Sequence, residues 1–295
     1  MDHRSEVREF LSSRRARITP EQVGLATDGS VRRVPGLRRE EVAALAGVSV
    51  DYYTRVERGN LRGVSGRVLN ALARALRMEQ DERMYLFALA RAAESGTDRA
   101  PRNYSRPAAL RPSVRAIIDG LVGLPVTVSD SRMQMVAANA LGRALCAPLF
   151  DSPDGLANHA RFIFLDPRAD EFWVDWEDLA AEAVGSLRNA VARDPYDQDL
   201  SDLIGELATR SDRFRQLWAS RDVYVHKGGL MRINHAVIGR VDLTYEILRL
   251  ETQPELAMLA FSAETGSPSH DALTLLASWA KTLDGSSVDD ARHRL

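Results

Sequence analysis

The chain has 295 residues, of which 45% are hydrophobic and 27% charged, values that are ordinary for a folded protein and allow two domains. No apolar run approaches the roughly 18 residues of a membrane helix, and residues 1–10 lack the apolar core of a signal peptide. We therefore expect a cytoplasmic protein with no membrane partner. A single cysteine, Cys146, excludes an intrachain disulfide and a zinc site built from several cysteines.

The net charge of −2 conceals an asymmetry between the two ends of the chain. Residues 1–100 contain 18 Arg and 14 acidic residues, a net charge of +4, whereas the remaining residues carry −6. A cationic N-terminal part is typical of a segment that faces nucleic acid. Almost all the cations are arginine, which suits bidentate recognition of phosphate or guanine, although genomic composition would produce the same bias.

The N-terminal part of the chain predicts five helices. The first covers residues 5–18, the fourth begins after the capping residue Ser65, and the fifth covers residues 80–92. The residues expected to form their apolar faces are Val7, Phe10, Leu11, Leu69, Leu72, Leu76, Met84, Leu86, Phe87 and Leu89. We interpret these three helices as a scaffold with no base contacts.

Residues 37–59 predict the remaining two helices, joined by a tight turn. In the first of the two, Val42, Leu45 and Ala46 have the spacing of one buried face. Gly47 suits the positive φ that often follows a helix end, and Ser49 is a good N-cap for the next helix. Short paired helices of this kind are typical of DNA-binding motifs, the alternative being a plain solvated hairpin.

The helix after Ser49 has an inward and an outward side. Tyr53 and Val56 are three residues apart and are expected to pack inward. A helix with short polar and cationic side chains on its outer side can enter the major groove of DNA. The residues that we expect to face the groove or its rim are Ser49, Val50, Asp51, Thr54, Arg55 and Arg58.

Phosphate contacts are expected from cations on either side of this helix. Arg38 and Arg39 lie in the first turn of a helix, where a cation is unfavourable for the helix dipole, so another partner is expected. A DNA phosphate is the natural one, and solvated loop charges are the alternative. Arg62 is assigned the same role, and the hydroxyl of Tyr52 is expected to reach a phosphate. Such domains usually bind as homodimers to two half-sites on double-stranded DNA.

The segments RRVPGLRREEVAALAGVS and VDYYTRVERG resemble the helix-turn-helix of the phage-repressor-like, xenobiotic-response-element class of bacterial regulators. They are especially similar to a subgroup in which this domain is followed by an MmyB-like ligand-binding domain. The resemblance implies a transcription regulator. The sequence predicts a DNA-binding domain at residues 1–95, a linker rich in Pro and Arg at 96–112, a second domain at 113–285 and a tail at 286–295.

The second domain has the pattern of an α+β fold with an antiparallel sheet and helices over one face. Helices are expected from Ser113 onward and at residues 139–149, 176–193, 200–218 and 273–283. Strands are expected at residues 125–129, 133–137, 223–226, 230–234, 237–250 and 256–263. In the longest of these, Val241, Leu243 and Tyr245 alternate with polar residues, which indicates one buried and one wet face.

The segments ARFIFLDP, VDWEDLAAEAVGSLR, GELATRSDRFRQLWASRDV, VIGRVDLTYEIL and FSAETGSPSHDALTLLASW resemble the MmyB-like domain itself. The resemblance implies a PAS-like fold whose pocket takes a small, lipophilic, fatty-acid-like ligand. Two departures from the family pattern bear on the ligand: Arg221 stands where a histidine is frequent, and Ala236 stands where a proline is frequent.

The candidate ligand-binding residues combine aromatic side chains with a few polar groups. Arg161, Asn139 and His235 are the expected anchors for a carboxylate, with Tyr245 behind them, and Phe164 and Trp176 supply apolar surface. Ordinary core packing is the alternative for each. The leading interpretation is a ligand-responsive, homodimeric transcription regulator. A second is a regulator whose C-terminal domain only dimerises or docks a partner. A third, an enzyme, is disfavoured because common catalytic motifs are missing, and we expect no metal, cofactor or catalytic residue.

Overall fold

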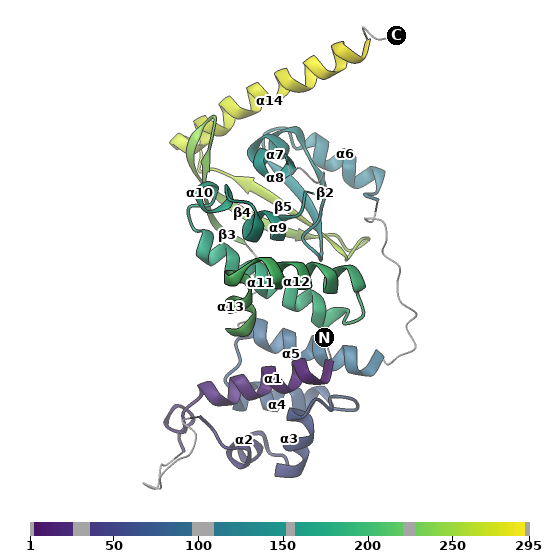
Figure 1. Ribbon diagram of the computed structural model, residues 1–295, viewed down its shortest axis with the longest axis vertical. Helices are drawn as coiled ribbons and strands as arrows, with labels where there is room; N and C mark the ends of the chain where they lie inside the picture. Colours follow the sequence, from purple (N-terminus) through teal and green to yellow (C-terminus); the bar gives the residue numbers. More distant parts are fainter. Residues whose placement is uncertain (1–2, 26–35, 96–108, 152–156, 221–227, 293–295) are drawn as a thin grey trace. The chain divides into compact units, whose positions relative to one another are not determined.

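The computed structural model describes residues 3–25, 36–95, 109–151, 157–220 and 228–292 (Figure 1). The predicted strand at residues 223–226, the departure at Arg221 and most of the predicted linker lie outside the described residues. Packing divides the chain into two compact units. The N-terminal unit contains residues 1–102 together with 188–202 and 217–225, and the C-terminal unit contains the rest.

The N-terminal unit contains the five α-helices that the sequence predicts for the first domain. They are α1 (His3–Arg17), α2 (Arg39–Ala46), α3 (Val50–Glu57), α4 (Gly66–Ala75) and α5 (Gln80–Ser95), with a short 3-10 helix η1 (Glu21–Val23). The turn between α2 and α3 has the predicted chemistry. Gly47 has a φ of 66°, and the Oγ atom of Ser49 accepts a hydrogen bond from the Tyr52 amide at 3.1 Å.

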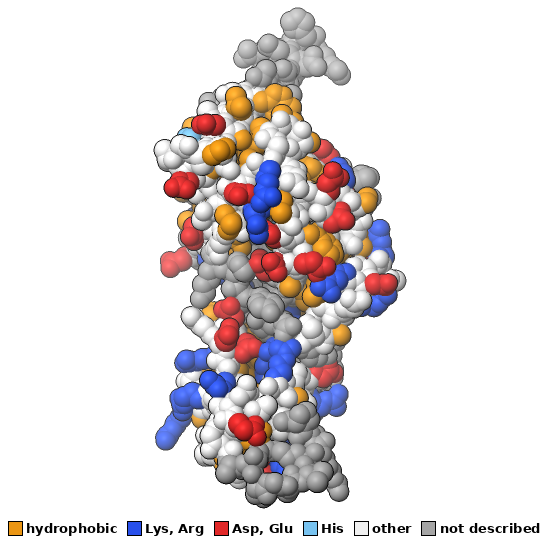
Figure 2. Space-filling model, turned by 90° about the vertical axis from the view of Figure 1, so that its left-hand side faces the viewer, with side chains coloured by type: hydrophobic (Ala, Val, Ile, Leu, Met, Phe, Trp, Pro, Cys, Tyr) orange, Lys and Arg blue, Asp and Glu red, His pale blue; other side chains and the backbone are white. Residues whose placement is uncertain are grey.

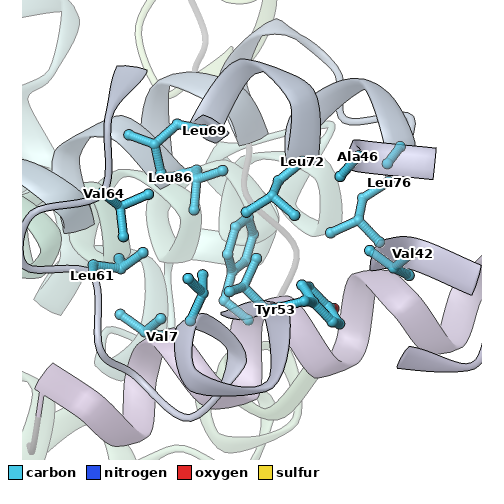
Figure 3. Packing of buried hydrophobic residues seen from close by; sticks show 14 of the residues in the cluster. Val7, Val42, Ala46, Tyr53, Leu61, Val64, Leu69, Leu72, Leu76 and Leu86 are labelled. Carbon is cyan, nitrogen blue, oxygen red and sulfur yellow. The ribbon is translucent and has the colours of Figure 1, made fainter. Parts of the chain in front are cut away.

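Apolar side chains from all five helices form the core of this unit, as Figure 3 shows for Val7, Tyr53 and Leu72. Two predicted core residues lie outside it: Leu45 is 38% exposed and Met84 is 50% exposed. In α2 the buried face is centred on Val42, Ala43 and Ala46, about 110° around the helix from Leu45. In α5 the buried face consists of Tyr85, Leu86 and Leu89, and Met84 lies on the other side of the helix.

A buried ionic cluster joins segments of the N-terminal unit that are far apart in sequence. Glu6 on α1 is 3% exposed and accepts hydrogen bonds from the Tyr85 hydroxyl at 2.6 Å and from Nη1 of Arg188 at 3.0 Å. Arg188 is 1% exposed, donates through Nη2 to the Trp218 carbonyl at 2.6 Å, and lies 4.4 Å from the centroid of the Trp218 ring. Burial, and then the charge of Glu6, raises the pKa of Tyr85 well above its ordinary value, so the hydroxyl remains a donor.

The C-terminal unit is built on one five-stranded antiparallel sheet, as the α+β pattern predicts. Its strands are β1 (Val126–Asp130), β2 (Met135–Ala138), β3 (Gly228–His235), β4 (Gly239–Arg249) and β5 (Leu256–Ser262), in the order β2-β1-β5-β4-β3. The register pairs Met231 with Leu243 and Thr244 with Ser262. Along β4, Val241, Leu243 and Tyr245 are buried and their neighbours exposed, which confirms the predicted alternation.

Among the helices that follow residue 110, α7, α10 and α14 contact strands of this sheet. Those that begin after residue 110 are α6 (Pro112–Gly120), α7 (Ala140–Leu145), α8 (Ala147–Phe150), α9 (His159–Leu165), α10 (Ala169–Phe172), α11 (Trp176–Arg193), α12 (Gln198–Arg210), α13 (Asp212–Ser220) and α14 (Pro268–Arg292). No described helix combines the length and the hydropathy that crossing a membrane requires.

Two helices predicted as continuous are each divided in the structure. Residues 200–218 form parts of α12 and α13, because the Oγ of Ser211 caps a new helix by accepting the Phe214 amide hydrogen at 3.1 Å. Residues 139–149 form α7 and α8. Pro148 has no N–H to donate to the Ala144 carbonyl one turn earlier, and Nε2 of His235 donates to that carbonyl instead, at 3.0 Å.

The substitution Arg188→Ala tests the importance of the ionic cluster. It should lower the free energy of unfolding by about 3–5 kcal/mol, because the Glu6 carboxylate would be buried without its cation. Urea denaturation followed by circular dichroism measures the change. The matched control is Arg210→Ala, because the Arg210 side chain is 57% exposed and pairs with Glu206 near the surface. Its loss should change the free energy of unfolding by less than about 1 kcal/mol. Equal losses in the two variants would contradict the assignment.

Candidate functional site

The outward side of α3 is polar and accessible, as its sequence predicts. Tyr53 and Val56 are fully buried, whereas Val50 is 44% exposed and Asp51, Arg55 and Arg58 are exposed. Tyr52 and Thr54 have intermediate exposure. The predicted groove-facing residues therefore share one side of a helix that is anchored from its other side, which is the arrangement that insertion into a DNA groove requires.

The arginines of the N-terminal unit fall into two groups. Within the described part of the chain, Arg55, Arg58 and Arg62 are exposed and have no carboxylate within ion-pair distance. The guanidinium of Arg55 lies 5.0 Å from the centroid of the Tyr52 ring, which restricts its conformations. Figure 2 shows cationic side chains standing out from the part of the molecule that contains this unit. These unpaired cations are available to phosphate or base edges.

The other group of arginines holds the buried carboxylate of Glu57, which is 1% exposed at the end of α3. Nε of Arg15 on α1 donates to it at 2.7 Å, and Nε of Arg39 on α2 makes a second, charge-assisted hydrogen bond. The Tyr53 hydroxyl adds a third at 3.2 Å. Arg15 also donates to the Leu37 carbonyl at 2.9 Å. This cluster fixes α3 relative to α1 and α2.

The cluster keeps Glu57 ionised. Burial alone would raise the pKa of the carboxyl, but the hydrogen bonds and charges of Arg15 and Arg39 outweigh it and lower the pKa below the ordinary value. Burial, followed by the charge of Glu57, raises the pKa of Tyr53, so its hydroxyl remains protonated.

The cations at the start of α2 have partners that the sequence does not reveal. Arg39 is bound to Glu57, although its side chain is still 50% exposed. Nη1 of Arg38 lies 3.5 Å from Glu40, and the Arg38 amide donates to Glu41 at 2.6 Å. Arg39 therefore positions α3 through Glu57, and its exposed part leaves a phosphate contact possible.

Gly59 follows α3 at a point where the chain passes very close to α1. Its φ is 97°, and an added Cβ atom would lie 2.5 Å from the Arg4 carbonyl oxygen. Glycine is required here both for the backbone conformation and for the close approach. The end of α3 is thus fixed by backbone contact as well as by Glu57.

In the C-terminal unit, two predicted ligand anchors are fully used by the backbone. The Asn139 side chain accepts from the Val126 and Gly142 amides at 3.0 and 2.7 Å and donates to the Leu121 and Leu124 carbonyls at 2.9 and 2.8 Å. That set satisfies all the hydrogen bonds an asparagine side chain can make. Asn139 therefore holds the loop before β1 and caps α7, and it has no free atom for a ligand.

The second such anchor is His235. Its Nε2 donates to the Ala144 carbonyl, and its Nδ1 accepts the amide hydrogens of Val237 and Ile238 at 3.2 and 3.3 Å. The ring joins the β3–β4 turn to the end of α7. Both ring nitrogens make these contacts, which is what the alternative of ordinary core packing expects for His235.

The other predicted ligand residues do not form one cluster. Nε of Arg161 donates to Glu206 at 2.8 Å, and Phe164 packs edge-on against Phe214 at 5.1 Å. Nε1 of Trp176 donates to the Ile163 carbonyl at 2.9 Å, and its ring packs against the core that contains Tyr245. The structure brings Trp176 and Tyr245 to the same core, whereas Phe164 is absent from it.

Glu182 on α11 is a partner of Tyr245 that sequence reasoning missed, because 63 residues separate the two. Burial, then the charge of Asp178, raises the pKa of Glu182 to about 7, although the hydrogen bond with Tyr245 acts in the opposite direction. Burial and Glu182 in turn raise the pKa of Tyr245. Residue Glu182 is half-buried, so this unit contains a partly buried carboxyl group whose pKa is raised toward neutral pH.

Two other polar groups of this unit lack hydrogen bonds. Within the described residues, Nε2 of His159 and Nε1 of Trp173 are buried and have no partner. Trp173 is 2% exposed, and the centroids of the two rings lie 5.4 Å apart. Leaving a buried polar group without any hydrogen bond generally costs about 1–3 kcal/mol, so such groups usually have a partner. Sequence reasoning did not select either residue.

A depression of about 230 Å³ lies between α6, α7 and α14. It is lined by Asp119, Val122, Asn139, Ala140, Leu141, Ala277 and Ala280. Its volume is below the roughly 300 Å³ at which most small-molecule sites begin. Among the predicted ligand residues it includes Asn139, whose side chain is already fully bonded.

Replacing Glu57 by glutamine should lower the free energy of unfolding at neutral pH by about 2–4 kcal/mol, because two arginines lose their shared anion. The folded-state pKa of Glu57 lies below its ordinary value of 4.5. Its stabilisation is therefore complete above that pH and is lost as the pH falls through the folded value. Denaturant titrations at several pH values should show a shallower acid-induced loss in Glu57→Gln. Glu40→Gln, at a 63% exposed site, is the control and should resemble the wild type.

Comparison with known proteins matches the two parts of the chain to two different domain families. Residues 6–86 match the model of a helix-turn-helix domain, and no curated protein matches the chain. Residues 110–276, more than half of the chain, match the MmyB-like transcription regulator ligand binding domain. The segment that matches the helix-turn-helix model contains the accessible α3, and the segment that matches the ligand-binding domain contains all five strands of the antiparallel sheet. The chain therefore belongs to the transcription regulators in which a helix-turn-helix DNA-binding domain is followed by an MmyB-like ligand-binding domain.

Proposed function

We propose that this regulator binds a specific operator as a homodimer and that a small lipophilic molecule in the C-terminal domain controls its binding. The proposal of DNA binding is supported mainly by the accessible side of α3, where Arg55 and Arg58 are exposed and have no acidic partner among the described residues. The proposed groove-facing residues are Ser49, Val50, Asp51, Thr54, Arg55 and Arg58. The proposed phosphate contacts are Arg38, Arg39 and Arg62, with the Tyr52 hydroxyl.

Among these residues, Arg55 is the best candidate for reading a base. It is exposed in the last turn of α3 and lies over the Tyr52 ring, so less side-chain entropy is lost when it binds. A bidentate contact to guanine is the usual use of arginine in the major groove. Arg62 lies beyond the helix and suits the backbone, where a contact adds affinity without sequence preference.

Homodimer formation is proposed from the size of the reading element. The eight residues of α3 can contact only a few base pairs. Two copies on half-sites about 34–36 Å apart would double the contact and match a palindromic operator. A ligand would control such a dimer only to the extent that it binds one arrangement of the two copies more tightly.

The ligand is proposed to be lipophilic because the interior of the C-terminal unit is rich in aromatic side chains, including Phe162, Phe172 and Trp173. A fatty-acid-like molecule and a PAS-like classification are proposals that the family resemblance and the five-stranded antiparallel sheet support. Arg161, Phe164, Trp176 and Tyr245 stay in the proposed set. The side chains of Asn139 and His235 already hydrogen-bond to backbone groups, which favours the second candidate function. In that candidate the C-terminal domain has a packed core, binds no ligand, and serves for dimerisation or for docking a partner.

Arg55→Ala should weaken binding to a selected operator by about 1–3 kcal/mol and leave binding to scrambled duplex almost unchanged, because a base contact is lost. Arg62→Ala should weaken both alike and reduce the salt slope by about one. Fluorescence anisotropy with the two duplexes measures these effects. Arg74→Ala, at an exposed position on α4, is the control. Operator binding by Arg55→Ala that equals the wild type would remove Arg55 from the reading set.

Operator selection from random duplexes, with and without a cell-lipid extract, tests ligand control and dimer formation together. Two inverted half-sites about one helical turn apart are expected, with enrichment that changes when the extract is present. Native mass spectrometry of the purified chain should detect both the dimer and a bound lipid. An unchanged operator pool, together with no bound lipid and no thermal shift on adding fatty acids, would support the domain without ligand.

A further inference from the structure

Within the described residues of the C-terminal unit, the unpartnered ring nitrogens of His159 and Trp173 differ from the one other buried side-chain atom that has no hydrogen bond, Nε of Arg213. The Arg213 guanidinium forms an ion pair with Glu177 through another nitrogen. An indole has a single polar atom. Among the described residues, His159 makes no side-chain hydrogen bond. The single polar atom of the Trp173 ring and the buried nitrogen of the His159 ring beside it therefore have no hydrogen-bond partner.

The position of each ring is fixed by the fold. His159 is the first residue of α9, where its amide donates to the Met133 carbonyl at 2.9 Å. Trp173 follows α10, and its backbone pairs with Ile233 of β3 in an isolated bridge. His159 as a whole is partly exposed, but its Nε2 atom is shut off from solvent.

The surroundings of the pair are aromatic. The Phe172 ring lies 4.7 Å from the Trp173 ring, and the Phe162 ring lies 5.8 Å from that of Phe172. Burial lowers the pKa of His159 to about 4, so its ring is neutral at neutral pH. Arg161, the cation expected to bind a carboxylate, is already paired with Glu206. A neutral hydrogen-bonding pair beside aromatic rings suits an uncharged ligand better than an anion.

We propose that Nε2 of His159 and Nε1 of Trp173 form the hydrogen-bonding part of the ligand site in this domain. The ligand class is a lipophilic molecule with an uncharged oxygen acceptor, such as a ketone, an ester or an alcohol. An indole N–H only donates, so the ligand atom that meets Trp173 must accept. This assignment rests on the ligand control proposed above, and it adds two residues to that site and replaces the carboxylate by a neutral head group.

The test uses the full chain and two probes of equal length, 2-octanone and octanoate, in calorimetric titrations. The wild type should bind 2-octanone more tightly than octanoate. Trp173→Phe and His159→Phe should each weaken 2-octanone binding by about tenfold, the loss expected for one hydrogen bond. The matched control is Trp279→Phe, which makes the same chemical change at an indole that is 41% exposed and outside the aromatic core. It should weaken binding clearly less than Trp173→Phe does.

A second measurement on the wild type keeps the proposal testable should a variant not fold. In a chain with ¹⁵N-labelled tryptophan, saturation with 2-octanone should shift the indole resonance of Trp173 and leave that of the exposed Trp279 in place. An unshifted Trp173 resonance would overturn the assignment. Tighter binding of octanoate than of 2-octanone would overturn the ligand class.

The failure of this inference can be told from the failure of ligand control itself. Binding of 2-octanone that survives both ring substitutions, with operator binding still responsive to a cell-lipid extract, would overturn the assignment and leave ligand control standing. No binding of either probe to the wild type, together with operator binding that the extract does not change, would overturn both.

Discussion

The buried carboxylate of Glu57 is the constraint on which the DNA-binding side of this protein depends. A carboxylate that is 1% exposed would be very unfavourable alone, and it is stable here because two guanidinium groups and a hydroxyl bind it. Those groups come from α1, α2 and α3. The cluster therefore cannot form unless the three helices take one arrangement, and the outward side of α3 is a consequence of that arrangement.

This constraint explains why arginines of similar appearance in the sequence have different roles. Arg15 and Arg39 neutralise an internal charge, whereas Arg55, Arg58 and Arg62 have no such partner among the described residues. The first group gives α3 a fixed position, and the second gives it cations that a polyanion can bind. A modest net positive charge is sufficient for such a surface, because it is the local placement of the unpaired cations that matters.

The local features of the fold could be predicted from the sequence, and the long-range ones could not. Gly47, the Ser49 cap and the alternation along β4 depend on near neighbours, and all three are confirmed. The division of residues 200–218 depends on Ser211, which a periodic apolar pattern does not reveal. The outward residues of α3 follow from helical spacing, but the partners of Arg39 and His235 lie 18 and 91 residues away. Those partners decide which polar side chains remain free.

The ionic cluster around Glu6 means that the folding unit of the DNA-binding part is not a continuous stretch of chain. Residues 188–202 and 217–225 belong to the same compact unit as α1 and α5, although they also lie within the matched ligand-binding domain. A fragment cut at Arg102 would keep Glu6 and Tyr85 and lose Arg188 and Trp218. Such a truncated helix-turn-helix would keep the Glu6 carboxylate without the arginine that neutralises it, and its operator affinity would understate that of the intact chain.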